Sequence, residues 1–393
     1  MTKTGTDTGR RIVYLEAVTP LLSDPQSRGR ALAWVGRDFP WAVGDGWSLE
    51  WWGVRSRADR TVSLDGMRVR GPRVPFKRLP RIVLMACAWA THLVLALRYP
   101  RAAILLARSP SLGVGAAVAR RIRRGSSLVV RVVERSSSKA LNLYGSERVF
   151  RILDTLDRFA LRRADLVFLL GEFTTTLARR AGVADDRILV VPSPTSWGGV
   201  APVPDGARNP QAVACAARLH PEKGIDVLIR AFAAVSSEFP EAVLDIAGEG
   251  RERASLESLS AELGVAGRVR FRGWLDPRDM PAFLAGASIA VLPSRVEEGQ
   301  SRALQEAGLA GCALIGSDCG GIRDVVKPGR TGLLVPPDDP DRLADALRRL
   351  LKNPQEARRL GEGARALAVA HFARRNAALD QLKQRMYALA RTP

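Results

Sequence analysis

ASIAVLPSRVEEGQSRALQEAGLAGCALIGSD, residues 287–318, holds two short apolar runs separated by a polar loop and a helical segment. The runs ASIAVLPS and CALIGSD have the length of buried strands, and RALQEAGLAG between them has helical spacing. A strand, a helix and a second strand in this order predict two neighbouring parallel strands joined by a crossover helix.

The same alternation continues on both sides of this stretch. Together with those two runs, it predicts an α/β protein built from doubly wound, Rossmann-like parallel sheets with helices on both faces. The further predicted strands are RRIVYLEAV, AAILLARS, SLVVRVVE, ADLVFLLGE, AVACAAR, AVLDIAG, VRFRGW and TGLLVPP. The further predicted helices are residues 80–98, 113–124, 147–163, 174–181, 224–239, 251–264, 279–287 and 341–353, and the tail from residue 356 is helical throughout.

The length of 393 residues suits two domains better than one core. A Pro- and Gly-rich stretch, TSWGGVAPVPDGARNP, interrupts the alternation near its middle. The predicted organisation is therefore a first Rossmann-like domain at residues 1–196, a linker at 197–210, a second Rossmann-like domain at 211–365 and a terminal helix at 366–393.

Positive charge is concentrated in the first half of the chain. Residues 1–200 hold 33 Lys and Arg against 16 Asp and Glu, which leaves 17 of the net +20 charges there, and they include Arg120, Arg121, Arg123 and Arg124. Such a field favours an anionic partner, such as a membrane surface or an acidic substrate. A solvated basic face without a partner is the alternative. Nucleic acid is disfavoured because no binding motif is present and aromatic residues make up only 6% of the chain.

Nothing in the sequence indicates a metal site, a disulfide framework or a membrane span. The four cysteines form no CxxC pair and the three histidines are scattered, which predicts reduced thiols in a cytoplasmic protein. The most apolar segment, residues 82–97, is shorter than the roughly 20 residues that cross a bilayer. We expect a buried helix there, with a helix lying on the membrane surface as the alternative. The amino-terminal residues do not have the pattern of a signal peptide.

Two cations lie around the turn after the strand AVACAAR. Arg218 and Lys223 flank the turn, and Gly224 opens the following helix. Cations beside the free N–H groups of a helix start are suited to a diphosphate. Solvated surface cations are the alternative.

The loop that starts the helix of the opening stretch has a similar composition. Gly299 permits close approach of a ligand, Ser301 can cap the helix, and the amides of residues 300–302 are predicted to be unpaired donors. Glu298 and Glu306 would lie about 12 Å apart along a helix, so they can border one extended ligand at two points. Carboxylates accept hydrogen bonds from paired hydroxyls, as in a sugar or a ribose. The alternative is an acidic first turn that only complements the helix dipole.

Read together, RLHPEKG, AGEG, VRFRGWL, EGQSRALQEA, SDCGGIRDVV and GRTGLLVPPDD resemble the carboxyl-terminal half of the family-4 retaining glycosyltransferases. The resemblance extends from about residue 213 to 351 in the family's order. It implies the GT-B fold, in which two Rossmann-like domains face each other across a cleft and the terminal helix returns to the first domain.

By this resemblance, Arg218 and Lys223 bind the donor diphosphate, Glu298 contacts the transferred sugar and Glu306 holds the ribose. Glu298, Lys223 and Arg218 are the residues expected at the catalytic centre. The other residues implied in donor binding are Gly299, Gln300, Ser301, Arg302 and Trp274, the last near the nucleotide base, and the pair Gly320 and Gly321 borders the same site.

The chain also departs from the family pattern. Gln300 and Ser301 replace a frequent Phe-Gly, which removes one aromatic contact. Pro192, Ser193 and Pro194 stand where Pro-Asn-Gly is usual. The first half matches only in its rhythm of strands and helices, and Glu134 lies roughly where the family often has a His.

The function implied is retaining, metal-independent transfer of a hexose-type sugar from a UDP- or GDP-sugar, without a cofactor. The basic first half predicts an anionic or lipid-linked glycan acceptor of cell-surface polysaccharide synthesis, and a location in the cytoplasm or on the inner face of the cell membrane. Two alternatives stay open: transfer to a soluble natural product, and a protein that binds a nucleotide sugar without catalysis.

Overall fold

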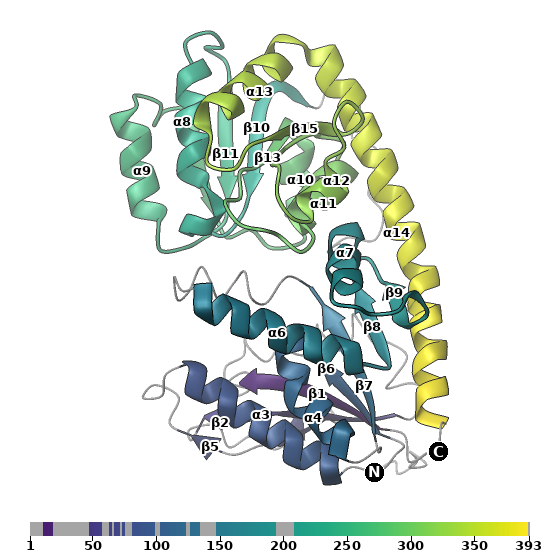
Figure 1. Cartoon of the computed structure of the whole chain (residues 1–393). Coiled ribbons are helices and arrows are strands. Elements are labelled where there is room, and N and C mark those ends of the chain that lie inside the picture. The colour runs from purple at the N-terminus through teal and green to yellow at the C-terminus, as the bar shows by residue number, and fades with distance from the viewer. Residues whose placement is uncertain are drawn as a thin grey trace, which may run out of the picture. The chain divides into compact units, whose positions relative to one another are not determined.

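The computed structural model describes residues 11–18, 47–56, 63–64, 67–70, 73–74, 81–98, 103–122, 126–133, 147–193 and 208–391. The chain divides into two compact units (Figure 1). The first comprises residues 1–170, 174–191 and 376–393, and the second comprises residues 171–173 and 192–375. The predicted linker, Arg123, Arg124, Pro194 and Glu134 fall wholly or largely outside the described residues.

The first unit contains a nine-stranded sheet whose main path has the order β3-β4-β2-β1-β6-β7-β8-β9, with β5 paired to β2. Its pairs are parallel apart from β3 with β4. The strands are β1 (Arg11–Val18), β2 (Ser48–Ser56), β3 (Ser63–Leu64), β4 (Met67–Arg70), β5 (Arg73–Val74), β6 (Ala103–Ala107), β7 (Ser127–Val132), β8 (Leu166–Leu169) and β9 (Ile188–Val190).

Helices supply both faces of this sheet with apolar side chains. Alternate strand residues such as Leu105 and Val130 pack with helical residues such as Ala117, Ala160 and Ala178 on one face. The strand residues that point to the other face of the sheet pack against the end of the terminal helix. The helices of the unit are α3 (Arg81–Arg98), η2 (Pro110–Gly113), α4 (Val114–Ile122), α6 (Glu147–Arg163), α7 (Glu172–Arg180) and η3 (Asp185–Arg187).

The second unit contains a six-stranded, wholly parallel sheet of order β12-β11-β10-β13-β14-β15. The order reverses at β10 and β13, so the loops that follow these two strands lie at the topological switch point, where parallel sheets bind ligands. The strands are β10 (Asn209–Ala216), β11 (Val243–Ala247), β12 (Val269–Gly273), β13 (Ala287–Leu292), β14 (Ala313–Ser317) and β15 (Gly332–Val335).

Two layers of helices cover the second sheet (Figure 1). Helices α8, α9 and α13 pack on one face, and α10, α11 and α12 pack on the other. The helices of the second unit are η4 (Pro221–Lys223), α8 (Ile225–Val235), α9 (Arg253–Glu262), α10 (Met280–Ala285), α11 (Arg302–Leu309), α12 (Ile322–Val325) and α13 (Pro340–Lys352). The two doubly wound α/β units confirm the predicted fold class.

Helix α14 (Pro354–Arg391) is a single helix of 38 residues. Its residues as far as Arg375 belong to the second unit, and those from Asn376 onward belong to the first. Leu382 and Met386 are fully buried in the core of the first sheet. The terminal residues of α14 are therefore structural members of the first unit.

Helix α3, the most apolar predicted helix, buries one face only. Ala88, His92 and Ala96, four residues apart, are buried, whereas Val94 is 46% exposed. The prediction of a buried helix is correct for that face. None of the helices in the described ranges combines the length and apolarity needed to cross a bilayer.

Three of the four cysteines are described, and all three are free thiols. Burial raises the pKa of Cys215 and of Cys319 to about 12. Both therefore stay protonated at neutral pH, which makes them poor nucleophiles and metal ligands.

Candidate functional site

Two loops of the second unit, which follow β10 and β13, pack against each other through their backbones. Gly224 ends the first loop in the left-handed conformation, with φ of 64°. A Cβ atom at this position would lie 2.1 Å from the carbonyl oxygen of Pro293. Only glycine allows both this dihedral angle and this approach, so the sequence brings Lys223 beside the end of β13.

Lys223 and Glu298 meet at this junction. Their ammonium and carboxylate groups form an ion pair, with the two side chains 14% and 17% exposed. The hydroxyl of Ser294, which is fully buried, donates to Oε1 of Glu298 at 2.7 Å. One carboxylate oxygen, Oε1, thus accepts from both Lys223 and Ser294, in a partly desolvated position where charges interact more strongly than in water.

Arg295 fixes the two loops to each other. Its guanidinium donates to both carboxylate oxygens of Asp226 at 2.8 and 2.7 Å, and to the carbonyl of Pro221 at 2.8 Å. It also donates to Asp338 at 2.7 Å, in the loop after β15. Burial alone would raise the pKa of Asp226, but the hydrogen bonds and charge of Arg295 hold that pKa below its usual range. This planar clamp gives the Lys223–Glu298 pair a defined geometry.

The amino-terminal end of α11 follows Glu298 in the same loop. The Ser301 hydroxyl caps the helix by accepting from the amide of Leu304 at 3.2 Å. Within the ranges that the structure describes, the amides of Gln300, Ser301 and Arg302 donate to no protein acceptor. Unpaired amides at a helix start carry partial positive charge and attract anionic oxygens.

The predicted glycine pair packs against this loop. Gly321 donates its amide to the carbonyl of Glu298 at 2.7 Å. A Cβ atom on Gly321 would lie 1.9 Å from the carbonyl oxygen of Gly299, so no side chain fits there. The loop after β14 thus supports the loop that carries Glu298.

The remaining predicted residues are less closely grouped. The Arg218 side chain is 65% exposed and forms an ion pair with Glu222 at 3.2 Å. In the described structure it forms no ion pair with Glu298 and no hydrogen bond to Lys223. Glu306 is buried in the second turn of α11, and Trp274, directly after β12, is 68% exposed. The structure therefore brings together Lys223, Glu298 and the start of α11, while the roles of all the predicted site residues stay predictions.

Several residues that shape this site were not found from the sequence. Local sequence patterns assign no role to Ser294, Arg295 or His371. Arg295 lies three residues beyond β13, a strand that ends at the switch point, which is the one local signal that marks it. His371 lies on α14, and its partners Gln300 and Gln305 precede it by 71 and 66 residues, a separation that local patterns do not bridge.

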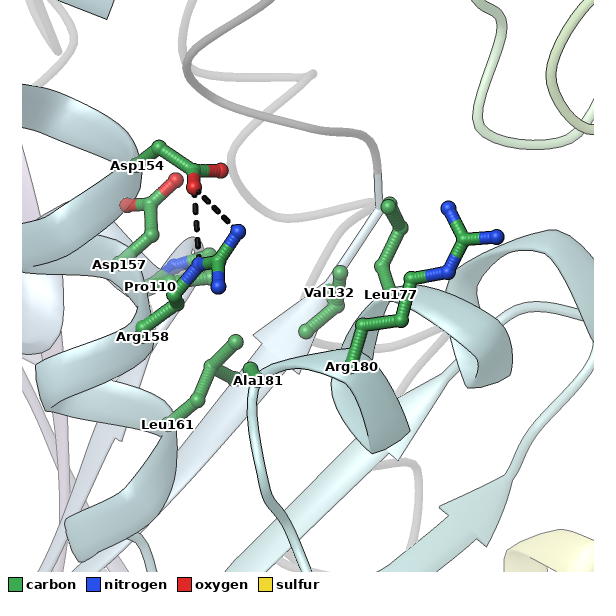
Figure 2. Close-up of a pocket in the computed structure, with 9 residues that line it drawn as sticks. All are labelled: Pro110, Val132, Asp154, Asp157, Arg158, Leu161, Leu177, Arg180 and Ala181. Atoms are coloured by element: carbon green, nitrogen blue, oxygen red, sulfur yellow. Dashed lines mark hydrogen bonds and ion pairs between the residues drawn. The ribbon is translucent and has the colours of Figure 1, made fainter. Parts of the chain in front are cut away.

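Two cavities in the described structure lie away from these residues. One, in the first unit, has a volume of about 110 Å³ and is rimmed by Asp154, Asp157, Arg158 and Arg180 (Figure 2). Asp154 and Arg158 are ion-paired at 2.8 Å, and the volume is below the roughly 300 Å³ at which small-molecule pockets begin. The second, of about 440 Å³, lies over β10, β11 and β12 and contains none of the predicted site residues. Neither cavity is lined by the predicted donor-binding residues.

Part of the positive charge of the first unit has internal partners. Arg120 forms an ion pair with Asp165, which also accepts from the amide of Leu128 at 2.8 Å. Arg163 lies over the ring of Phe159 at 4.1 Å. These arginines have partners inside the fold, so the count of 33 basic residues overstates the number of cations offered to a partner.

No group of three or more His, Cys, Asp or Glu side chains suited to a metal ion occurs among the described residues. Lys223 and the amides before α11 are instead the electropositive groups at the site. Metal-independent chemistry stays a prediction.

Two family models match this chain. The model described as "Glycosyl transferase 4-like domain" matches residues 27–194, and the model described as "Glycosyl transferases group 1" matches residues 205–367. Together they take in most of both units. The chain belongs to the family-4 glycosyltransferases, which confirms the predicted family.

Curated relatives match part of the chain. A GDP-mannose-dependent alpha-(1-6)-phosphatidylinositol monomannoside mannosyltransferase from Mycolicibacterium smegmatis is 29% identical over 54% of this chain and 60% of its own length. An alpha-D-kanosaminyltransferase from Streptomyces kanamyceticus is 33% identical over 42% of each chain. The chain thus spans about half the length of these relatives.

Solved structures share the fold over almost the whole chain. A sucrose-phosphate synthase from Thermosynechococcus elongatus superimposes with a TM-score of 0.71 at 21% identity, covering 96% of this chain and 99% of that one. HepE from Anabaena, in complex with UDP, gives a TM-score of 0.68 at 20% identity and covers 96% and 100%. At these identities the likeness shows the fold alone.

Proposed function

We propose that this protein transfers a hexose-type sugar from a nucleoside diphosphate sugar to a hydroxyl acceptor, with retention of anomeric configuration. The observation that carries the proposal is the Lys223–Glu298 pair beside the unpaired amides that begin α11. A cation and helix amides suit a diphosphate, and a carboxylate suits sugar hydroxyls. The names of the relatives support a nucleotide-sugar donor.

In the proposed reaction, the bond between the anomeric carbon and the phosphate oxygen breaks and its electron pair leaves with the diphosphate. Lys223 and the amides of residues 300–302 stabilise the charge that develops on this leaving group. The acceptor oxygen bonds to the anomeric carbon on the same face, and its proton passes to a phosphate oxygen. Glu298 binds and orients the sugar, and Arg218 is proposed to add a second cation at the diphosphate.

A thermal-shift comparison of UDP-, GDP- and dTDP-sugars tests donor binding. A ligand that binds only the folded chain at 100 times its Kd stabilises it by about 2.7 kcal/mol, which raises the melting temperature by several degrees. We expect this shift with one of the UDP- or GDP-sugars, accompanied by transfer or slow release of nucleoside diphosphate. A shift without turnover would favour the non-catalytic alternative. No shift with any of them would contradict the proposed function.

For the acceptor, we propose a lipid-linked or otherwise anionic glycan that the protein reaches at the inner face of the membrane. The excess of 17 positive charges in residues 1–200 supports this class. The relative from M. smegmatis is named for a phosphatidylinositol mannoside, which supports it as well. The kanosaminyltransferase name supports the competing class, a soluble natural product.

Sedimentation with liposomes separates these acceptor classes. We expect the full chain to sediment with vesicles that contain phosphatidylserine at low salt, and to dissociate as ionic strength shortens the Debye length from roughly 30 Å at 0.01 M to 8 Å at 0.15 M. Vesicles of neutral phosphatidylcholine are the control. Equal sedimentation with both lipids, or none with either, would favour a soluble acceptor.

A further inference from the structure

A half-buried imidazole contacts both segments that carry the predicted Glu residues. His371 Nε2, on α14, lies 3.1 Å from Nε2 of Gln300 and 3.2 Å from Nε2 of Gln305. Gln300 is two residues beyond Glu298, and Gln305 directly precedes Glu306. One ring nitrogen therefore touches a residue near each end of the proposed donor-binding segment.

The hydrogen-bond roles in this group follow from the orientation of one amide. The carbonyl oxygen of the Gln300 side chain accepts from the backbone N–H of Ser193 at 2.9 Å. Its NH₂ group must then face His371 as a donor. Nε2 of the imidazole is consequently the acceptor, and the ring proton is on Nδ1.

The environment keeps the imidazole in this neutral form. Burial, together with the charges of Arg374 and Arg375, lowers the pKa of His371 to about 4. A protonated ring would direct an N–H group at the Gln300 NH₂ group, which cannot turn without giving up Ser193. The neutral ring, in contrast, offers a lone pair to both glutamine amides.

The same turn of α14 is tied to the segment where the chain enters the second unit. Arg375, which is buried, donates to the carbonyl of Pro192 at 2.6 Å. Pro192 and Arg375 are the boundary residues of the longer segment of this unit. The loop before α11, the entry segment and α14 thus form one hydrogen-bonded group.

We propose that His371 is a positioning residue for the nucleotide sugar: it holds Gln300 and Gln305 so that the amides before α11 and the two Glu residues keep the geometry that binds the donor. This role rests on the proposed function. It assigns to α14 a part in donor affinity, although His371 itself touches no substrate. Without the imidazole acceptor, the loop before α11 is less ordered in the free protein. The free energy of donor binding is then less favourable, because binding must also order this loop.

Calorimetric titration of the full chain with UDP and with GDP tests this role. His371→Leu should weaken nucleoside diphosphate binding about three- to tenfold, the effect of losing one or two neutral hydrogen bonds. His371→Gln, whose amide oxygen can accept, should regain most of the affinity. The matched control is His92→Leu, which removes a buried imidazole that bonds to the carbonyl of Leu112 in the first unit. It should leave the affinity unchanged.

A double-mutant cycle distinguishes positioning from a general loss of stability. In a Gln300→Met background, His371→Leu should cause little further loss, because the contact is already absent. If His371→Leu folds poorly, Gln305→Met removes the other amide contact and takes its place. Unchanged affinity in these variants, or additive losses in the cycle, would overturn the role of His371 alone. A wild-type chain that binds neither nucleotide would overturn the proposed function as well.

Discussion

Lys223→Met is expected to lower sugar transfer at least about 100-fold, the loss typical when one preorganised donor to a developing oxyanion is removed. The variant also leaves the carboxylate of Glu298 with the Ser294 hydroxyl as its remaining bonded partner in the described structure. An uncompensated carboxylate would then face the donor diphosphate, so donor affinity should fall together with turnover. The measurement is kcat/KM for the donor sugar, with nucleoside diphosphate binding measured by titration.

The matched control is Lys352→Met, which removes an exposed lysine at the end of α13. It changes the net charge equally and should leave transfer unchanged. Thermal unfolding of both variants checks that the fold is retained. Wild-type transfer by Lys223→Met would exclude this lysine from the reaction.

Glu298→Gln is expected to separate binding from transfer. The amide keeps the shape of the side chain but loses the charge that holds the Lys223 ammonium. Nucleoside diphosphate binding should therefore be unchanged or tighter, because Lys223 is released to the phosphates. Transfer should fall about 10- to 100-fold, since a hydrogen bond to a charged group contributes about 1.5–3 kcal/mol.

Glu297→Gln is the control for this variant, because it neutralises the adjacent carboxylate, which has no assigned role. Steady-state kinetics with the donor sugar and calorimetry with UDP and GDP give the two readouts. Equal loss of transfer in both variants would point to a general electrostatic effect. Weaker nucleotide binding in Glu298→Gln would contradict competition between Glu298 and the diphosphate for Lys223.

The fold of the second unit could be predicted because its central strands are buried on both faces and each strand is followed by a helix. The predicted strand over residues 287–294 and helix over 302–311 correspond to β13 and α11. The first unit was less predictable. Strand β2, SLEWWGVRS, lies beside β1 in the sheet, yet no regular helical pattern joins it to the neighbouring strands in the sequence.

The candidate site was predicted in its residue types and only partly in its contacts. Spacing at the ends of β10 and β13 made Lys223 and Glu298 candidates, because the carboxyl ends of adjacent parallel strands share one edge, and the resemblance to the glycosyltransferase family selected them. It could not show that Arg218 pairs with Glu222, since the direction of an exposed side chain depends on its local partners. It also could not reveal Arg295 or His371, whose contacts connect segments distant in the sequence.

The most direct measurement of donor binding is a crystal structure of the chain with UDP or GDP. We expect phosphate oxygens within about 3.2 Å of the Lys223 ammonium and of amides among residues 300–302, with the ribose near Glu306. A nucleotide bound elsewhere, with the Lys223–Glu298 pair and the amides of α11 out of reach of its phosphates, would contradict the proposed site.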